Sequence, residues 1–375
     1  MSMYNGVFKK SIDVSVIAKQ SAPAKENDSS KEHSIVFFNK SNDIADVAYS
    51  VEVSEGISYP FTLKLTVLSS LKPSRTELKN DLLFSKYTVT LRQDNESSDA
   101  VSARVKRERK FKGIVTSYAF RGSAPSAQNL EKSCYVYELT IEPELVLLSL
   151  KKRTCHYSGM SVIEIIQDLF KKHDLQSYCE IDLSHFGQDK FDDKSFVFEQ
   201  NQETDLEFLN RILRQFSINY CFDDSRDDYK VSFSRSSSVY SHFPVTTQED
   251  TTKDTVVNAI VNPNLELKAG DNSYIFNAYY KGSSLQGSIY SDEEDAFFSD
   301  KVESNLNTDI AGNSKQLYYI NESHNKIRNI LDEYLVLSAS DLVFASGVNF
   351  LLKDEVSCFN NCQCLIVRSY LKFNV

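Results

Sequence analysis

The chain lacks long apolar stretches, and none of its 375 residues is tryptophan. No run approaches the roughly 18 apolar residues that a membrane-spanning helix requires, so we expect no such helix. The first residues, MSMYNGVFKKSIDVSV, lack the continuous apolar segment of a secretory signal peptide. We therefore expect a protein that is made in the cytoplasm and carries no export signal of this kind.

Basic residues are in deficit, because 42 Lys and Arg stand against 52 Asp and Glu and give a formal net charge of −10. A general nucleic-acid-binding surface needs a basic excess to displace counterions from phosphates, so we expect no nucleic-acid partner. One basic run exists, RVKRERK at residues 104–110. It precedes a predicted strand and contains one apolar and one acidic residue, so we interpret it as a solvated loop or strand edge.

The seven cysteines show no disulfide pattern. They are odd in number and scattered, which without an export signal indicates reduced thiols. Cys358, Cys362 and Cys364 form C-x-x-x-C-x-C, and thiolates can bind zinc. A tetrahedral site needs a fourth ligand, and no nearby histidine supplies one. Buried thiols are therefore the favoured interpretation, and a metal site is the alternative.

Recognisable enzyme motifs are missing as well. The sequence has no H-E-x-x-H, no Walker loop and no dinucleotide fingerprint. GSSLQG at 282–287 is one residue off the nucleophile elbow of hydrolases, with Ser284 at the serine position, but no strand-to-helix context surrounds it. The acidic run DEED at 292–295 lacks the alternating spacing of a calcium loop, which favours a solvated acidic face.

Cys155 and His156 are the remaining candidate pair for catalysis. Adjacent residues on a strand face opposite sides, so we do not expect one to activate the other directly. We therefore predict no catalytic residue, no cofactor and no metal. A hydrolase or an effector toxin stays open as the alternative function.

What the chain does contain favours strands. Phenylalanine and tyrosine are numerous, at 24 and 20 residues, and aromatic enrichment is typical of β-structure. Hydrophobic residues make up 41% and charged residues 25%, which is enough apolar material for a sizeable core without disulfide or metal support. The length suggests two or three domains.

The first section, residues 1–154, is rich in predicted strands with no convincing helix between them. Period-two alternation marks most of them, for example Phe61, Leu63 and Leu65 against intervening polar residues. The predicted strands are Ser11–Val16, Ile35–Phe38, Ala48–Val53, Phe61–Leu68, Tyr87–Leu91, Phe111–Tyr118 and Tyr135–Ile141. Such a series points to a barrel or sandwich.

Residues 155–240 have the character of an α/β insert. Ser161-Val-Ile-Glu164 and Thr204-Asp-Leu-Glu207 are capping boxes, and each begins a predicted helix with one apolar face. The second helix is expected to bury Phe208, Leu209, Ile212, Leu213 and Phe216. Alternating residues at 218–222 and 229–233, on either side of an acidic turn, then predict a hairpin.

Residues 241–375 return to predicted strands, at Val256–Val261, Tyr274–Tyr280, Val348–Leu352 and Cys364–Val367. Between them we predict an extended loop or arm at 282–312. We also predict a helix in which Ile327, Ile330, Leu331, Tyr334 and Leu335 keep helical spacing. The predicted domains are a first β-barrel-like domain at 1–154, an α/β insert at 155–240 and a second β-barrel-like domain at 241–375. The fold class is mainly β with an α/β insert.

Five segments resemble, in order and spacing, motifs of the VgrG spike proteins of type VI secretion and of the related hub proteins of contractile phage tails. They are SEGISYPFTLKL (54–65), FKGIVT (111–116), YELTIEPELVLL (137–148), SVIEII (161–166) and TDLEFLNRIL (204–213) with INYCF (218–222) behind it. GVNFL (347–351) and CLIV (364–367) resemble the closing strands of that region. The resemblance covers about residues 50–235.

The sequence also departs from the family pattern. Phe216-Ser217 stands where the family often has glycine, and the 282–312 arm is peculiar to this chain. The chain stops where the family continues into an oligonucleotide/oligosaccharide-binding-like barrel and a needle-like β-helix.

The resemblance implies two barrel-like domains per subunit and a pseudo-six-fold ring when the subunits form a trimer. It implies a structural baseplate hub that joins a trimeric spike to the hexameric tail tube and nucleates tube assembly. The implied partners are further copies in a homotrimer, the tail tube protein, baseplate wedge proteins, the spike and secreted effectors. The implied location is the cytoplasm, with ejection on contraction. A secretion system, a phage and an extracellular injection particle all fit this sequence.

Overall fold

The computed structural model describes residues 13–21, 47–70, 72–94, 107–125, 133–175, 180–182, 197–216, 218–223, 230–234, 261–267, 273–280, 283–290, 302–305, 333–338, 342, 345–352 and 362–374. No helix within these ranges is long and apolar enough to cross a membrane. Three predicted segments lie wholly or largely outside the described residues. They are the strand Ile35–Phe38, residues 256–260 of the strand Val256–Val261, and residues 327–332 of the predicted helix.

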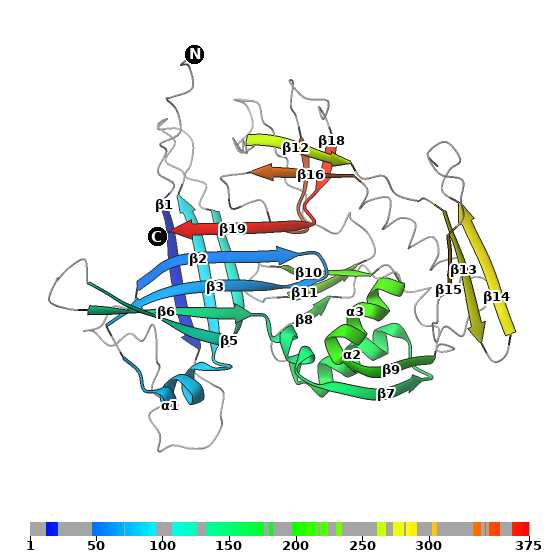
Figure 1. Cartoon of the computed structure of the whole chain (residues 1–375), viewed down its shortest axis with the longest axis horizontal. Helices are drawn as coiled ribbons and strands as arrows, with labels where there is room; N and C mark the ends of the chain where they lie inside the picture. The colour runs from blue at the N-terminus through cyan, green and yellow to red at the C-terminus, as the bar shows by residue number, and fades with distance from the viewer. Residues whose placement is uncertain are drawn as a thin grey trace, which may run out of the picture.

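A curled seven-stranded sheet forms the largest element (Figure 1). Its strand order is β1-β4-β5-β6-β3-β2-β19, and every neighbouring pair is antiparallel. The strands are β1 (Asp13–Ser21), β2 (Val47–Gly56), β3 (Tyr59–Ser69), β4 (Lys86–Asp94), β5 (Arg107–Pro125), β6 (Ser133–Glu142) and β19 (Arg368–Asn374). Six of them confirm strands predicted in the first section, whereas β19 was not predicted and comes from the end of the chain.

Alternation along these strands builds the core of the sheet. In β3, Phe61, Leu63, Leu65 and Val67 are at most 1% exposed, while the residues between them face away from the core. Val51, Val53, Val89, Leu91, Leu139 and Ile141 complete the same cluster. Burial of each such side chain stabilises the fold by about 1.5–3 kcal/mol relative to exposure.

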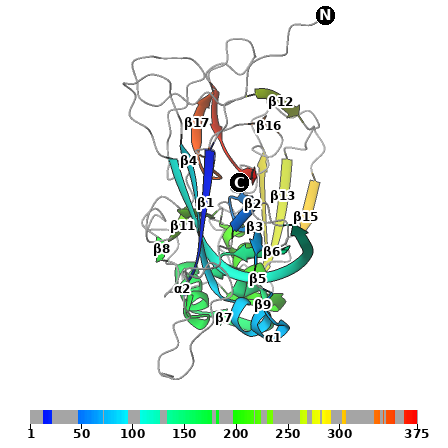
Figure 2. The ribbon, with the colours of Figure 1, turned by 90° about the vertical axis from the view of Figure 1, so that its left-hand side faces the viewer.

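The curl of the sheet has a local cause in β5, the long strand that bends beneath the others in Figure 2. A Cβ atom at Gly113 would lie 2.3 Å from the carbonyl oxygen of Glu142, so only glycine permits this approach of β5 and β6. The register shifts twice, between Val115 and Ser117 and between Phe120 and Gly122. Bulges of this kind increase twist and bend a sheet.

A short helical segment lies between β3 and β4 in the first section, where we predicted no helix. It consists of α1 (Arg75–Glu77) and a π-helical turn, η1 (Leu78–Leu82). The prediction missed the capping box in which Ser74 Oγ accepts from the amide of Glu77 and the Glu77 carboxylate accepts from the amide of Ser74. Leu78 and Leu82, four residues apart, are buried against the sheet core.

The α/β insert follows β6 and has its own core, which begins with residues of η2, before position 155 where the predicted insert starts. Its elements are η2 (Glu144–Ser149), β7 (Lys152–Ser158), α2 (Val162–Lys172), β8 (Glu180–Asp182), β9 (Val197–Thr204), α3 (Asp205–Gln215), β10 (Asn219–Asp223) and β11 (Lys230–Ser234). Both capping boxes form: Ser161 Oγ accepts from the amide of Glu164 at 3.2 Å, and Thr204 Oγ1 accepts from the amide of Glu207 at 3.1 Å. β10 and β11 pair as the predicted hairpin.

A buried carboxylate ties the insert together. Asp205, 1% exposed at the start of α3, accepts from Gln200 Nε2 of β9 at 2.8 Å. Its Oδ2 lies 2.6 Å from Nε2 of His173, which follows α2, and 3.3 Å from Nε of Arg153 on β7. A single side chain therefore connects four elements, and a buried carboxylate with this many partners stabilises the insert.

The last section corrects two predictions. β16 (Glu333–Ser338) is a strand, not the end of a helix, and pairs with β12 (Val261–Leu267), so that Leu335 lies opposite Leu265. Short apolar runs fit helix and strand equally well by periodicity, and pairing decided between them. The predicted arm at 282–312 contains β14 (Ser283–Tyr290) and β15 (Val302–Asn305), which flank β13 (Ser273–Tyr280).

The remaining described strands are β17 (Asn349–Leu352) and β18 (Cys362–Leu365), an antiparallel pair at positions where closing strands were predicted. The described elements confirm a mainly β fold with an α/β insert. The division into two barrel-like domains and the pseudo-six-fold ring stay predictions.

The helix phase of α3 can be tested with Leu209→Asp. Leu209 is 0% exposed in the insert core, so an unpaired carboxylate there is expected to lower the free energy of unfolding by about 3–5 kcal/mol. Thermal melting is the measurement. Gln167→Asp, on the exposed side of α2, is the matched control and should change stability by less than about 1 kcal/mol. A melting temperature of Leu209→Asp within about a degree of wild type contradicts the helix phase.

Candidate functional site

The residues weighed for catalysis do not converge. Cys155 and His156 are neighbours on β7, where Cys155 is partly buried against the insert core and His156 is exposed. Ser284 lies opposite Tyr279 in the β13–β14 pair, so its context is strand beside strand and not strand to helix. A nucleophile elbow is therefore not formed at Ser284.

The candidate metal ligands are only partly described. Asp292–Asp295 and Cys358 lie outside the described residues, and Cys362 and Cys364 lie on β18. Within the described part of the chain, no three His, Cys, Asp or Glu side chains are grouped so that they could hold a metal ion.

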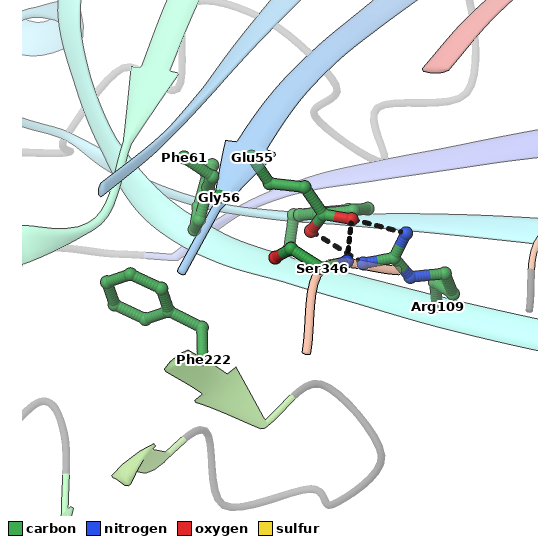
Figure 3. A pocket seen from close by; sticks show the side chains of 7 residues that line it. Glu55, Gly56, Phe61, Arg109, Phe222 and Ser346 are labelled. Carbon is green, nitrogen blue, oxygen red and sulfur yellow. Dashed lines mark hydrogen bonds and ion pairs between the residues drawn. The ribbon is translucent and has the colours of Figure 1, made fainter. Parts of the chain in front are cut away.

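The structure draws attention instead to the turn between β2 and β3, around a small pocket shown in Figure 3. The pocket is lined by Glu55, Gly56, Phe61, Arg109, Phe111, Phe222 and Ser346. Its volume of about 10 Å³ has room for about one water molecule. No organic substrate fits such a space, so the site is a contact between chain segments and not a binding cavity.

A buried ion pair forms one wall of this pocket. Arg109 of β5 donates two hydrogen bonds to Glu55 of β2, from Nη1 to Oε1 at 3.0 Å and from Nη2 to Oε2 at 2.8 Å. The side chains are 7% and 10% exposed. The guanidinium also lies over the Phe111 ring, 4.8 Å from its centroid. A bidentate pair of this geometry fixes both side chains.

Glu55 also binds the last section of the chain. Its Oε1 accepts from the backbone amide of Ser346 at 3.1 Å and from Oγ of Ser369, on β19, at 2.6 Å (Figure 3 shows the Ser346 contact). Beside it, the amide of Ile57 donates to the carbonyl of Val367 at 2.9 Å. The β2–β3 turn is thereby joined to residues about 300 positions later in the sequence.

The next residue of the turn binds the insert. Ser58 has a left-handed backbone, with φ of 60°, and its amide donates to the carbonyl of Tyr220 at 2.8 Å. Its Oγ donates to Oδ1 of Asn219 at 3.1 Å. The turn Glu55–Ser58 therefore joins the sheet, the insert and the last section, and we call it the junction.

Aromatic packing closes the other side of the junction. Phe61 meets Phe111 and Phe222 edge to face, with ring centroids 5.4 and 5.8 Å apart. Phe222, on β10, packs against the cores of both the sheet and the insert. Edge-to-face pairs of this kind add about 0.5–1.5 kcal/mol each to the burial of their area.

Folding shifts the pKa values of two buried carboxylates, Glu55 and Glu144, in opposite directions. Burial alone would raise the pKa of Glu55, but the charge and hydrogen bonds of Arg109, with those of Ser369 and Ser346, outweigh it and hold the pKa below its usual range. Glu144, at the start of η2, is 7% exposed, and burial raises its pKa against the attraction of Lys86 and Lys112. Glu55 is thus stabilised as an anion, whereas Glu144 is not.

Arg109 corrects the interpretation of the basic run at 104–110 as a solvated loop or strand edge. Residues 104–106 lie outside the described part, but Arg109 is 6% exposed and neutralises Glu55. The signal that could have identified it is alternation: Arg109, Phe111 and Gly113 occupy every second position of β5 and are all buried. The acidic partner, 54 residues away, carries no local signal.

A protein-family model described as phage tail baseplate hub (GPD) matches residues 54–270, more than half of the chain. No curated protein matches the chain in sequence. The match begins at the junction and includes the motifs on which the resemblance to spike and hub proteins rested, and that resemblance is confirmed.

Solved structures share the fold at low sequence identity. An E. coli component of the type VI secretion system, described as similar to the T4 tail proteins gp27 and gp5, matches with a TM-score of 0.59 at 13% identity, over 89% of this chain and 72% of that one. A 43 kDa tail protein of prophage MuSo2 from Shewanella oneidensis matches with a TM-score of 0.58 at 8% identity, over 88% and 94%. A chain of the half-lidded PdpA–VgrG complex of Francisella gives 0.55 at 10% identity, over 99% and 56%.

The structure accounts for several positions of the motifs. In the motif SEGISYPFTLKL (54–65), Glu55 forms the ion pair with Arg109, Ser58 donates a hydrogen bond to the insert, and Phe61 is buried in the core. In FKGIVT, Gly113 permits the close approach to β6, and Thr116 Oγ1 donates to Glu142 Oε2 at 2.6 Å. In YELTIEPELVLL, every second residue from Tyr137 to Ile141 is buried, as are Leu145 and Leu148.

The opposite electrostatics of Glu55 and Glu144 predict opposite pH effects on stability. A carboxylate whose pKa is lowered by folding stabilises the fold above the unfolded pKa of about 4.3, and this contribution is lost as the pH falls through the folded pKa. Glu55→Gln is therefore expected to cost about 3–5 kcal/mol near pH 7, because it leaves Arg109 buried without its anion, and this cost should shrink only as the pH falls through the lowered folded pKa of Glu55.

Glu144→Gln serves as the matched control. Because the pKa of Glu144 is raised by folding, its ionisation opposes folding at neutral pH, so the variant should be at least as stable as wild type near pH 7 and equal to it at acid pH. Thermal melts of the three proteins between about pH 3 and pH 8 give the comparison. Equal losses at pH 7 for both variants would show that the sign assigned to one of the carboxylates is wrong.

Proposed function

The chain belongs to the phage tail baseplate hub family, and we propose that it joins a trimeric spike to a hexameric tail tube and nucleates assembly of that tube. A structural hub role is what the family assigns. The observation that supports the finer proposal is the family match over residues 54–270, which spans strands β3 to β6 of the sheet, the junction and the insert.

The junction fits a structural role better than a catalytic one. A hydrolase needs acid, base or nucleophile groups that converge on a space large enough for substrate. At the junction the charged groups converge on each other, and the pocket holds about one water molecule. We therefore propose that the chain is not an enzyme, and no described residue favours the alternative of a hydrolase or an effector toxin.

The proposed partners follow from the family. They are two further copies of the chain in a homotrimer, the tail tube protein, baseplate wedge proteins, and a spike that carries effectors. Two of the structural relatives are described as a type VI secretion component and as part of a complex of PdpA with VgrG, which supports a role of this kind. Assembly takes place in the cytoplasm, and contraction then ejects the hub.

We further propose the domain division 1–154, 155–240 and 241–375, with the two outer parts supplying six tube-like elements from three subunits. Pairing of β19 with β2 means that the last strand of the third part is built into the sheet of the first. In each subunit of such a ring, the first and third parts would be joined both by the chain itself and by the pairing of β19 with β2.

The trimer can be tested on the purified chain. Closed cyclic symmetry is the usual solution for a ring of identical subunits, so native mass spectrometry is expected to show a species of three times the chain mass. Light scattering across a concentration series gives the independent measurement. A monomer at every concentration would argue against the proposed hub architecture.

Deletion of the protein is expected to abolish tube and sheath formation altogether. A hexameric tube ring must bury its first face against a surface of matching symmetry, and without one it loses the contacts that offset the entropy of bringing six subunits together. Fluorescent sheath imaging in a deletion strain is the measurement.

The matched variants in the same strain are Ser284→Ala, Cys155→Ala and His156→Ala, which should restore normal sheaths. Leu209→Asp should not restore sheaths, because its insert is expected not to fold. Normal sheaths without the protein, or an alanine variant that assembles sheaths and loses a lytic activity, would favour the enzymatic alternative.

A further inference from the structure

The end of the chain is attached to the sheet in an unusual way. Residues 345–352 and 362–374, which we call the strap, contain β17, β18 and β19. β19 completes the edge of the seven-stranded sheet, although Ser369 and its acceptor Glu55 are separated by 314 positions (Figure 1). The strap is therefore a remote segment laid onto a sheet whose other strands come from residues 13–142.

The described side chains of β19, at 368–372, add little apolar burial, whereas Val348, elsewhere in the strap, is 5% exposed. Among residues 368–372, no side chain is buried, and only Leu371 packs partly against the sheet core. β2, to which β19 pairs, has Val51 and Val53 fully buried. Elements with few buried apolar contacts open at lower free energy than the core strands beside them.

The two limbs of the strap are held to each other. The amide of Gly347 donates to the carbonyl of Ile366 at 2.8 Å, and the amide of Ile366 donates to the carbonyl of Val348 at 3.0 Å. β17 and β18 continue this pairing from Asn349–Leu365 to Leu352–Cys362. The limbs therefore form one hydrogen-bonded unit.

A single carboxylate oxygen binds both limbs to the sheet. Oε1 of Glu55 accepts from the Ser346 amide on the first limb and from Ser369 Oγ on the second, while Arg109 holds the carboxylate from β5 (Figure 3). Hydrogen bonds to a buried charged acceptor are about twice as strong as neutral ones. Among the described residues, further attachments include backbone pairing, the ion pair of Lys372 with Glu52 at 2.6 Å, and Arg368 over the Tyr59 ring.

We propose that the strap opens and closes as one unit on a folded sheet and insert, and that Glu55, positioned by Arg109, is its latch. Opening releases both limbs together, because each is bound to the other and both are bound to the same oxygen. It leaves the β2 edge and the Glu55–Arg109 pair in place on the sheet. This inference rests on the junction geometry and does not depend on the proposed trimer or its partners.

Hydrogen exchange of the full chain, followed by mass spectrometry at pH 7, tests the latch. The variants are Glu55→Gln, which removes the charge that binds both limbs, and Ser369→Ala, which removes one hydrogen bond and leaves the ion pair intact. Ser50→Ala is the matched control, because Ser50 is a serine of β2, the strand that pairs with β19, and donates to Thr66 Oγ1 of β3 at 2.9 Å, away from the latch.

The expected result is faster hydrogen exchange in the strap. Peptides covering 345–352 and 362–374 should exchange about 10-fold faster or more in Glu55→Gln. In Ser369→Ala they should exchange about 3- to 10-fold faster, while peptides from β3, β6, α2 and α3 of that variant stay within about twofold of wild type. Ser50→Ala should leave the strap unchanged. If Glu55→Gln does not fold, Ser369→Ala alone gives the answer.

Three results would overturn the proposal. The first is acceleration of all peptides by the same factor in Ser369→Ala, which means global unfolding. The second is strap exchange that is unchanged in Ser369→Ala. The third is acceleration of one limb without the other, which means that the strap is not one unit. An absent trimer in native mass spectrometry, by contrast, bears on the proposed function and leaves this result valid.

Discussion

The buried ion pair between Glu55 and Arg109 is the constraint on which the arrangement of this subunit depends. Removing two charges from water costs several kcal/mol per ion, and the attraction between them compensates only when the geometry is good and the remaining lone pairs are satisfied. Here the bonds are bidentate, and Ser346 and Ser369 fill the outer positions of the carboxylate. Each partner that satisfies Glu55 comes from a different strand or loop. The electrostatic requirement of one side chain therefore dictates where three chain segments meet.

The aromatic cluster on the other side of the turn makes the same connection by apolar means. Phe222 belongs to the insert but packs against the sheet core through Phe61. Rotation of the insert relative to the sheet would separate these rings and break the Ser58 bonds to Asn219 and Tyr220. The junction therefore fixes the insert against the sheet.

Local patterns predicted the regular elements well, because each depends on neighbours in sequence. The capping boxes at Ser161 and Thr204 and the alternation from Phe61 to Val67 needed no distant information. β16 was assigned wrongly because a short apolar run fits two periodicities, and its partner β12 lies about 70 residues earlier. β19 and Arg109 were missed for the related reason that an edge strand and a buried cation are defined by remote partners. The motif around Glu55 marked the right turn, but only the structure shows what the carboxylate binds.

On the face of the sheet opposite the core, several described polar side chains are paired with one another across strands. Ser50 bonds to Thr66, Glu142 accepts from Thr62 and Thr116, and Arg121 pairs with Glu138. Because these polar groups already bond to one another across strands, each would gain little free energy from a new bond to a partner protein. An exposed ion pair contributes at most about 1 kcal/mol to stability. A surface of this kind discriminates by shape and summed area. Such a surface is the reverse of an active site, where a few unsatisfied groups are held ready for a substrate.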